Sequence, residues 1–174
     1  MCSHAMRIKV AIVEDDDWIR ENLAGQIRGA GKFDYVGAYS SAEAALEGLP
    51  SNPADVVLMD IALPKMNGIE CVRRLKQALP GTQFLMLTVY EDSNKIFDSL
   101  LAGASGYLLK RTPQSEIVSA VAAVHAGNSP MSGHIARKVV QFFNQRGSAS
   151  TEIENLSARE REVLDHLSRG LAYK

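Results

Sequence analysis

The stretch that decides the fold is Val56-Val57-Leu58-Met59, a continuous apolar run that ends at Asp60. Such a run is expected for a strand of a parallel sheet that helices cover on both faces. Over residues 68–79, apolar side chains then recur at the three- and four-residue steps of a buried helix face. Pro80-Gly81 ends this pattern. The stretch therefore predicts one strand–helix unit of an α/β fold.

The same alternation recurs on both sides of this unit. We expect further strands at residues 7–13, 33–39, 84–88 and 106–109. Apolar spacing predicts helices at residues 19–27, in a short segment after Ser40-Ser41, at 93–102, and from Pro113 to Val124. Five strand–helix units predict a doubly wound, five-stranded parallel sheet. The functional crevice of such a sheet lies at the carboxyl ends of its strands.

The composition is that of a globular chain. Of 174 residues, 46% are hydrophobic and 22% are charged, which excludes a largely disordered, collagen-like or coiled-coil protein. No apolar run approaches the ~18–20 residues of a membrane span, so we expect no membrane partner. The N-terminus lacks the apolar segment of a signal peptide. We interpret residues 1–5 as a tag remnant, with the native start near Met6.

The cysteine and charge counts bear on the cellular compartment and on the class of partner. Cys2 and Cys71 form neither a disulfide framework nor a zinc-ligand spacing, which favours a reducing cytoplasm. The formal net charge of −1 argues against a chain devoted wholly to nucleic acid. Residues 1–130 carry 12 Lys/Arg and 15 Asp/Glu, whereas residues 131–174 carry seven and five. The net charge therefore changes from negative in the first part to positive in the second, which is typical of a basic module that follows an acidic one.

Polar side chains stand where four of the predicted strands end, at Asp15, Asp60, Thr88 and Lys110. Because the carboxyl ends of parallel strands meet at one edge of the sheet, we expect these side chains to share a crevice. Close carboxylates repel one another unless a cation lies between them, and Mg²⁺ commonly takes one or two protein carboxylates with water and phosphate. An ammonium and a hydroxyl facing the same point would stabilise an anionic group on one carboxylate. The set predicts phosphoryl transfer to an aspartate.

Four motifs in this order resemble the receiver domain of two-component response regulators. They are Val13-Glu14-Asp15, residues 57–68, Leu87-Thr88 and residues 106–110, and the resemblance covers residues 6–128. It implies a flavodoxin-like fold with strand order 2-1-3-4-5. It also implies that Asp60 is the phosphoacceptor, which takes its phosphoryl group from a phosphohistidine on a sensor histidine kinase.

The resemblance implies a Mg²⁺ site beside the phosphoacceptor. Asp15, supported by Glu14, resembles the acidic pair that binds the ion together with Asp60. The backbone carbonyl of Ala62, two residues after Asp60, should complete the protein ligands. Asp16 is a third acid in this loop, and two roles stay open for it: indirect help to the ion, or capping of the following helix.

Three further residues resemble the phosphoryl-binding and switch positions of receivers. Lys110 should pair with one phosphoryl oxygen, Thr88 should donate a hydrogen bond to another, and Tyr107 should turn inward when Thr88 moves. Many receivers have proline directly after this lysine, in a cis bond, whereas here Arg111 and Thr112 precede Pro113. Whether the Lys110–Arg111 bond is cis or trans stays open at this point.

The C-terminal part follows a different pattern. Residues 129–155 are expected to form a linker with one helix, whose apolar positions are Ile135, Val139, Phe142 and Phe143. Residues 156–174 resemble the first part of a LuxR-type helix-turn-helix, without the recognition helix that enters the major groove. Together the two parts resemble a NarL/FixJ-type response regulator. This implies DNA as a partner of the complete C-terminal domain and a homodimer as a possible result of phosphorylation.

Two alternatives to a DNA-binding regulator stay open. The first is a receiver that acts only through protein contacts, with its tail as a docking helix. The second is a small-molecule phosphatase, although Ala62 stands where a haloacid-dehalogenase-like phosphatase would have a second Asp, and no phosphate-binding Gly-rich loop follows the first strand. On the leading interpretation the chain is not an enzyme, but it assists its own Mg²⁺-dependent phosphorylation and dephosphorylation.

Two aromatic residues near the motifs carry separate expectations. Tyr90 lies two residues after Thr88, and Ala62 lies two residues after Asp60. Both should flank the acyl phosphate, where a bulky ring and a methyl group cannot orient an attacking water by hydrogen bonds. We therefore expect slow self-hydrolysis. We interpret Trp18 as a residue that packs with its helix near the site rather than as a catalytic group.

Overall fold

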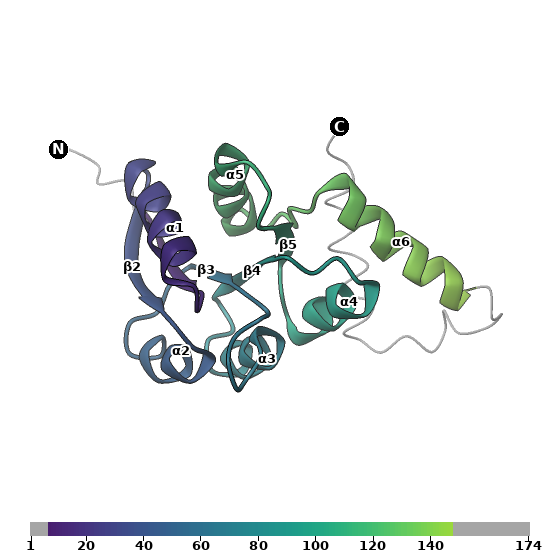
Figure 1. Cartoon of the computed structure of the whole chain (residues 1–174), viewed down its shortest axis with the longest axis horizontal. Coiled ribbons are helices and arrows are strands. Elements are labelled where there is room, and N and C mark those ends of the chain that lie inside the picture. The colour runs from purple at the N-terminus through teal and green to yellow at the C-terminus, as the bar shows by residue number, and fades with distance from the viewer. Residues whose placement is uncertain (1–6, 148–174) are drawn as a thin grey trace.

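The structure is a computed structural model that describes residues 7–147, and it has the predicted α/β architecture (Figure 1). The strands are β1 (Ile8–Val13), β2 (Phe33–Tyr39), β3 (Val56–Met59), β4 (Gln83–Thr88) and β5 (Gly106–Leu109). The helices are α1 (Asp17–Gly29), α2 (Ala42–Gly48), α3 (Gly68–Ala78), α4 (Ser93–Ala102), α5 (Gln114–His125) and α6 (Gly133–Gly147). The tag remnant expected at residues 1–5 and the helix-turn-helix expected at 156–174 lie outside the described residues.

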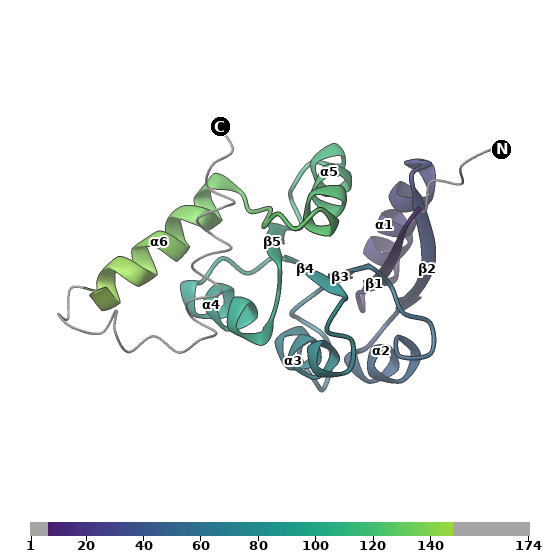
Figure 2. The same ribbon diagram turned by 180° about the vertical axis from the view of Figure 1, so that it is seen from behind.

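All five strands are parallel and lie in the order β2-β1-β3-β4-β5, as expected for a flavodoxin-like receiver. Helices α1 and α5 cover one face of the sheet, and α2, α3 and α4 cover the other (Figures 1 and 2). At the carboxyl edge, Val13 of β1 lies opposite Met59 of β3, and Thr88 of β4 lies opposite Leu109 of β5. The residues at the carboxyl ends of these four strands therefore lie along one edge of the sheet.

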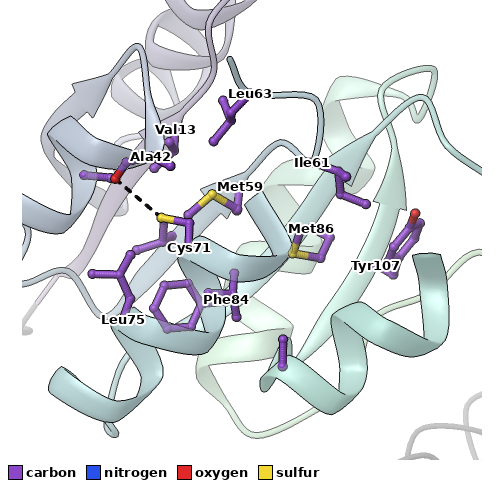
Figure 3. Packing of buried hydrophobic residues seen from close by; sticks show 14 of the residues in the cluster. Val13, Ala42, Met59, Ile61, Leu63, Cys71, Leu75, Phe84, Met86 and Tyr107 are labelled. Atoms are coloured by element: carbon purple, nitrogen blue, oxygen red, sulfur yellow. Dashed lines mark hydrogen bonds between the residues drawn. The ribbon is translucent and has the colours of Figure 1, made fainter. Parts of the chain in front are cut away.

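The sheet is buried on both faces, so the molecule has two apolar layers. One layer packs β-strand side chains against α1 and α5. Figure 3 shows part of the other layer, in which Met59, Phe84 and Met86 from neighbouring strands pack beneath α3 and Tyr107 lies at the β5 edge. Cys71 of α3 is buried there, and its thiol donates a 3.7 Å hydrogen bond to the carbonyl oxygen of Ala42. Each fully buried large side chain contributes about 1.5–3 kcal/mol of burial energy.

Side-chain caps fix where four helices begin. The side chains of Asp16, Ser41, Asn67 and Asp92 each accept a hydrogen bond from a main-chain N–H in the first turn of the helix that follows. Such caps satisfy main-chain donors that would otherwise lack a partner, and each contributes about 1 kcal/mol. Three of these caps, Asp16, Asn67 and Asp92, close the loops that follow β1, β3 and β4. They therefore set the length of the loops that carry the polar crevice.

Helix α6 is docked on the five-stranded α/β unit rather than separated from it. It runs beside α4 in both views (Figures 1 and 2), and Ile135 and Val139 are buried in the same apolar layer as Tyr107. The rings of Phe97 in α4 and Phe142 in α6 stack with centroids 4.2 Å apart. The apolar spacing predicted a helix here but could not predict its docking. Within residues 7–147, no helix is both long enough and apolar enough to cross a membrane.

Candidate phosphoryl-acceptor site

Two acidic side chains meet at the ends of the central strands. The N–H of Asp60 donates to the carbonyl oxygen of Val13 over 2.9 Å, which extends the β1–β3 pairing by one residue. Glu14 and Asp60 are thereby brought together, and both are almost fully buried. Carboxylate oxygens of Glu14, Asp15 and Asp60 all lie within 4.8 Å of one another. Within the part of the chain described, this is the one such cluster of potential metal-binding side chains.

The loop after β1 presents Asp15 to solvent while it holds Glu14 inside. The N–H of Asp16 donates to Glu14 Oε1 over 3.2 Å, and the Asp16 carboxylate caps α1 by accepting from the N–H of Ile19 over 2.9 Å. Of the two roles left open for Asp16, the cap is the one the structure contains. The exposed Asp15 carboxylate is the acid of this cluster that solvent reaches most easily.

Asp60 sits at the start of a tight loop that folds back on its own backbone. Its Oδ1 accepts a 2.7 Å hydrogen bond from the N–H of Ile61. A Cβ on Gly68 would lie 1.8 Å from the Asp60 carbonyl oxygen, so only glycine fits there. The backbone of Lys65 has a φ angle of 62°, in the left-handed region, and completes the turn. Ala62 lies exposed in this loop.

Lys110 joins the two buried carboxylates. Its Nζ lies 2.8 Å from Asp60 Oδ2 and 2.7 Å from Glu14 Oε2. Burial alone lowers the pKa of Lys110, but its hydrogen bonds to Asp60 and Glu14 outweigh burial and raise the pKa above its ordinary value. Burial raises the pKa of Glu14, and the neighbouring Asp60 charge adds to that rise, while Lys110 opposes it. The ammonium thus occupies the position of a counter-ion shared by both acids.

Thr88 and Tyr107 lie fully buried on the neighbouring strands. The Thr88 hydroxyl oxygen accepts from the N–H of Tyr90 over 3.4 Å, and the Tyr107 hydroxyl donates to the Tyr90 carbonyl oxygen over 3.0 Å. Both side chains therefore hold the same turn after β4. Burial, with the nearby acids, raises the pKa of the Tyr107 hydroxyl above its ordinary value. The ring of Tyr90 is half-buried, and Lys95 Nζ lies 3.4 Å from its centroid.

Two expectations at this site are now decided. No peptide bond among the described residues is cis, so the Lys110–Arg111 bond is trans. The expectation that Trp18 packs near the site is wrong, because its side chain is 75% exposed. Trp18 lies in the first turn of α1, on the side of the helix opposite the buried Leu23, Ala24 and Ile27.

Sequence reasoning missed two charged residues that support the site. Arg20 donates through Nη1 to the carbonyl oxygens of Glu14 and Asp15, over 2.8 and 3.2 Å. Glu91, in the turn after β4, pairs with Arg111 over 2.7 Å and with His134 of α6 over 3.1 Å. A basic residue four positions after the N-cap acid was a signal for Arg20. Nothing in the local pattern pointed to Glu91.

Chemically, the site brings together three carboxylates and one ammonium, with the buried Thr88 hydroxyl at the end of the neighbouring strand β4. Closely spaced carboxylate oxygens are the ligands that a hard divalent cation prefers. A carboxylate held between such a cation and an ammonium can carry an added anionic group. Residues 10–122 match the response regulator receiver domain family. The chain belongs to this family.

Curated relatives extend over nearly the whole chain. It is 33% identical to the transcriptional regulatory protein LnrK of Bacillus subtilis, across 96% of this chain and 80% of the relative. It is 32% identical to the DNA-binding transcriptional activator DevR/DosR of Mycobacterium tuberculosis, across 96% of this chain and 77% of that protein. The chain is therefore a response regulator of a two-component system, and its relatives regulate transcription. Members of this family are generally not classical enzymes.

Solved structures agree with this assignment. A LuxR-family two-component response regulator from Aurantimonas sp. SI85-9A1 is 29% identical, with a TM-score of 0.74 over 78% of this chain and 96% of that one. The signal receiver domain of the putative response regulator NarL from Mycobacterium tuberculosis is 27% identical, with a TM-score of 0.67 over 70% of this chain and 98% of that one. The resemblance to NarL/LuxR-type regulators is therefore confirmed.

Proposed function

We propose that this response regulator accepts a phosphoryl group on Asp60 from a phosphohistidine of a sensor histidine kinase. An Asp60 carboxylate oxygen attacks phosphorus, the bond from phosphorus to the histidine nitrogen breaks, and an acyl phosphate forms on Asp60. The observation that carries this proposal is the pairing of the buried Asp60 with Lys110 beside two further acids. Lys110 is then placed to exchange its contact with Asp60 for one with a phosphoryl oxygen.

Mg²⁺ is the cation that we propose for this site. Asp15 and Asp60 would bind it through carboxylate oxygens and Ala62 through its backbone carbonyl, with Glu14 in support. The fit rests on the three carboxylates within 4.8 Å of one another and on the exposure of Asp15, which leaves one side of the cluster open to solvent. When bound, the ion supplies positive charge that offsets the charge of the incoming phosphoryl group.

The route from this site to the rest of the molecule runs through Thr88 and Tyr107. If Thr88 donates its hydroxyl proton to the phosphoryl group, its contact with the N–H of Tyr90 changes. The Tyr107 hydroxyl donates a hydrogen bond to the carbonyl oxygen of Tyr90 in the same turn. The N–H of Tyr107 donates to the Pro130 carbonyl oxygen over 3.0 Å, just before α6. We therefore propose that phosphorylation alters the docking of α6.

The output that we propose is transcription regulation through DNA. The support is the likeness to DevR/DosR, a DNA-binding transcriptional activator, over 96% of this chain. On this proposal, residues 6–128 are the receiver, 129–155 the linker with its helix, and 156–174 the start of a LuxR-type helix-turn-helix. A homodimer formed on phosphorylation is part of the same proposal.

Intact-mass spectrometry tests the acceptor assignment. The chain is incubated with acetyl phosphate and MgCl₂, and one added phosphoryl group is expected for the wild type and for the control Asp55→Asn. Asp60→Asn should add none. Phosphorylation of Asp60→Asn to the wild-type extent would refute the assignment, and steady turnover of a small phosphate ester would favour the phosphatase alternative.

A further inference from the structure

Arg20 braces the acidic loop from a position outside the receiver motifs. Its Nη1 donates to the main-chain oxygens of Glu14 and Asp15, over 2.8 and 3.2 Å, and its Nη2 donates to the Asp17 carboxylate. The Arg20 side chain is only 16% exposed, although its helix lies at the surface. One planar guanidinium thus bonds to three residues, Glu14, Asp15 and Asp17, of the loop and first helical turn beside the candidate cation site.

The brace is rigid because Arg20 belongs to the first turn of α1. Its own N–H donates to the Asp16 carbonyl oxygen over 2.9 Å, and the Asp16 carboxylate caps the same turn. In the described part of the chain, the carboxylate of Asp15 has no hydrogen bond of its own. Its direction therefore depends on the main chain, which Arg20 holds at the carbonyls of Glu14 and Asp15.

We propose that Arg20 is a positioning residue for the cation site, an inference that rests on the Mg²⁺ site proposed above. It keeps the main chain of Glu14 and Asp15 in the orientation that aims both carboxylates towards Asp60. Charge alone would have the opposite effect, because a guanidinium near a divalent cation repels it. Positioning and charge therefore predict changes of opposite sign when Arg20 is replaced.

An Mg²⁺ titration of three variants separates these effects. In Arg20→Gln the positioning is lost, and the dissociation constant for Mg²⁺ should rise about tenfold, as is usual when a residue supporting metal ligands is removed. Arg20→Lys keeps the charge but lacks the fork that reaches two carbonyls and a carboxylate, so it should also bind Mg²⁺ more weakly. Arg28→Gln, which removes the same charge from the last turn of α1, is the matched control.

Affinity is read from the emission of Trp18, the single tryptophan, and independently from the rise in Tm with MgCl₂. Unchanged or tighter binding in Arg20→Gln relative to Arg28→Gln would overturn the inference, and so would wild-type affinity in Arg20→Lys. Circular dichroism checks that each variant is folded. Should Arg20→Gln not fold, the result for Arg20→Lys decides.

A further variant separates failure of this inference from failure of the proposed function. Asp15→Asn removes a proposed ligand and should abolish Mg²⁺ binding whatever Arg20 does. If the wild type binds Mg²⁺ and Asp15→Asn does not, the site stands and the Arg20 variants test positioning alone. If the wild type and Asp15→Asn respond identically to MgCl₂, the metal site itself is refuted, and the role of Arg20 with it.

Discussion

The Nζ atom of Lys110 lies 2.8 Å from Oδ2 of Asp60, and the Asp60 side chain is only 2% exposed. The same ammonium lies 2.7 Å from Glu14, so one cation balances two buried carboxylates. This arrangement makes Lys110 a structural residue as well as a proposed phosphoryl ligand. Stability and function are thus coupled at one side chain.

Replacement of Lys110 by Met should destabilise the fold, because it leaves Glu14 and Asp60 buried without their counter-ion. We expect a loss of about 2–3 kcal/mol, below the ~3–5 kcal/mol typical of a fully buried pair, since Lys110 retains some exposure. Urea unfolding measures the loss, and MgCl₂ should restore part of it. The exposed Lys9→Met in β1 is the control, and equal stability of the two variants would contradict the account.

Replacement of Gly68 by Ala should distort the loop that carries Asp60. The added Cβ would meet the Asp60 carbonyl oxygen at 1.8 Å, so the loop must move, and both stability and phosphorylation should fall. Gly25→Ala, in α1, meets no atom within 4 Å and should instead stabilise the chain by about 0.5–1 kcal/mol. Thermal unfolding compares them, and a normal Tm with normal phosphorylation in Gly68→Ala would be inconsistent with this loop.

Replacement of Phe142 by Ala should loosen α6 from α4 by removing the stack on Phe97. Hydrogen exchange should then speed up in residues 133–144, while the central strands keep their protection. Beryllium fluoride with MgCl₂, as a phosphoryl mimic, should change exchange in the same residues of the wild type. Val140→Ala, on a more exposed part of α6, is the control. Identical exchange in all states would argue against α6 as part of the switch.

Replacement of Tyr90 by Ala should shorten the lifetime of the phosphorylated chain. Tyr90 lies in the turn held by Thr88 and Tyr107, and its ring is expected to shield the acyl phosphate from water. The decay of phosphorylated protein after removal of the phosphodonor measures this. A lifetime that is unchanged or longer than that of the wild type would count against the expected shielding.

The sequence was sufficient for the strands, because β1, β3, β4 and β5 are largely apolar runs that end at polar residues and the more polar β2 is bounded by turn residues. Val56–Met59 followed by Asp60 is the clearest case, and the bounds of β2, α4 and β5 also follow from local patterns. The strand order implied by the resemblance to receivers then places Glu14 beside Asp60, and the structure confirms that order. What remained unpredicted depends on partners distant in the chain or on side-chain direction.

The docking of α6, the contacts of Glu91 and the exposure of Trp18 belong to this second group. Phe142 and Phe97 are 45 positions apart, and a helical period says which face of α6 is apolar but not what covers it. Trp18 was expected to pack with its helix near the site, whereas its side chain is 75% exposed. In α1, position 18 lies on the side of the helix opposite the buried Leu23, Ala24 and Ile27, so the indole faces solvent.

The central claim is that Asp60 carries the phosphoryl group. After phosphorylation with acetyl phosphate and MgCl₂, borohydride reduces an aspartyl phosphate to homoserine, and peptide mass spectrometry locates that residue. The account predicts homoserine at position 60 and unmodified Asp15 and Asp55, with no homoserine when MgCl₂ is omitted. Homoserine at another acid, or a phosphoryl group that resists borohydride, would contradict it.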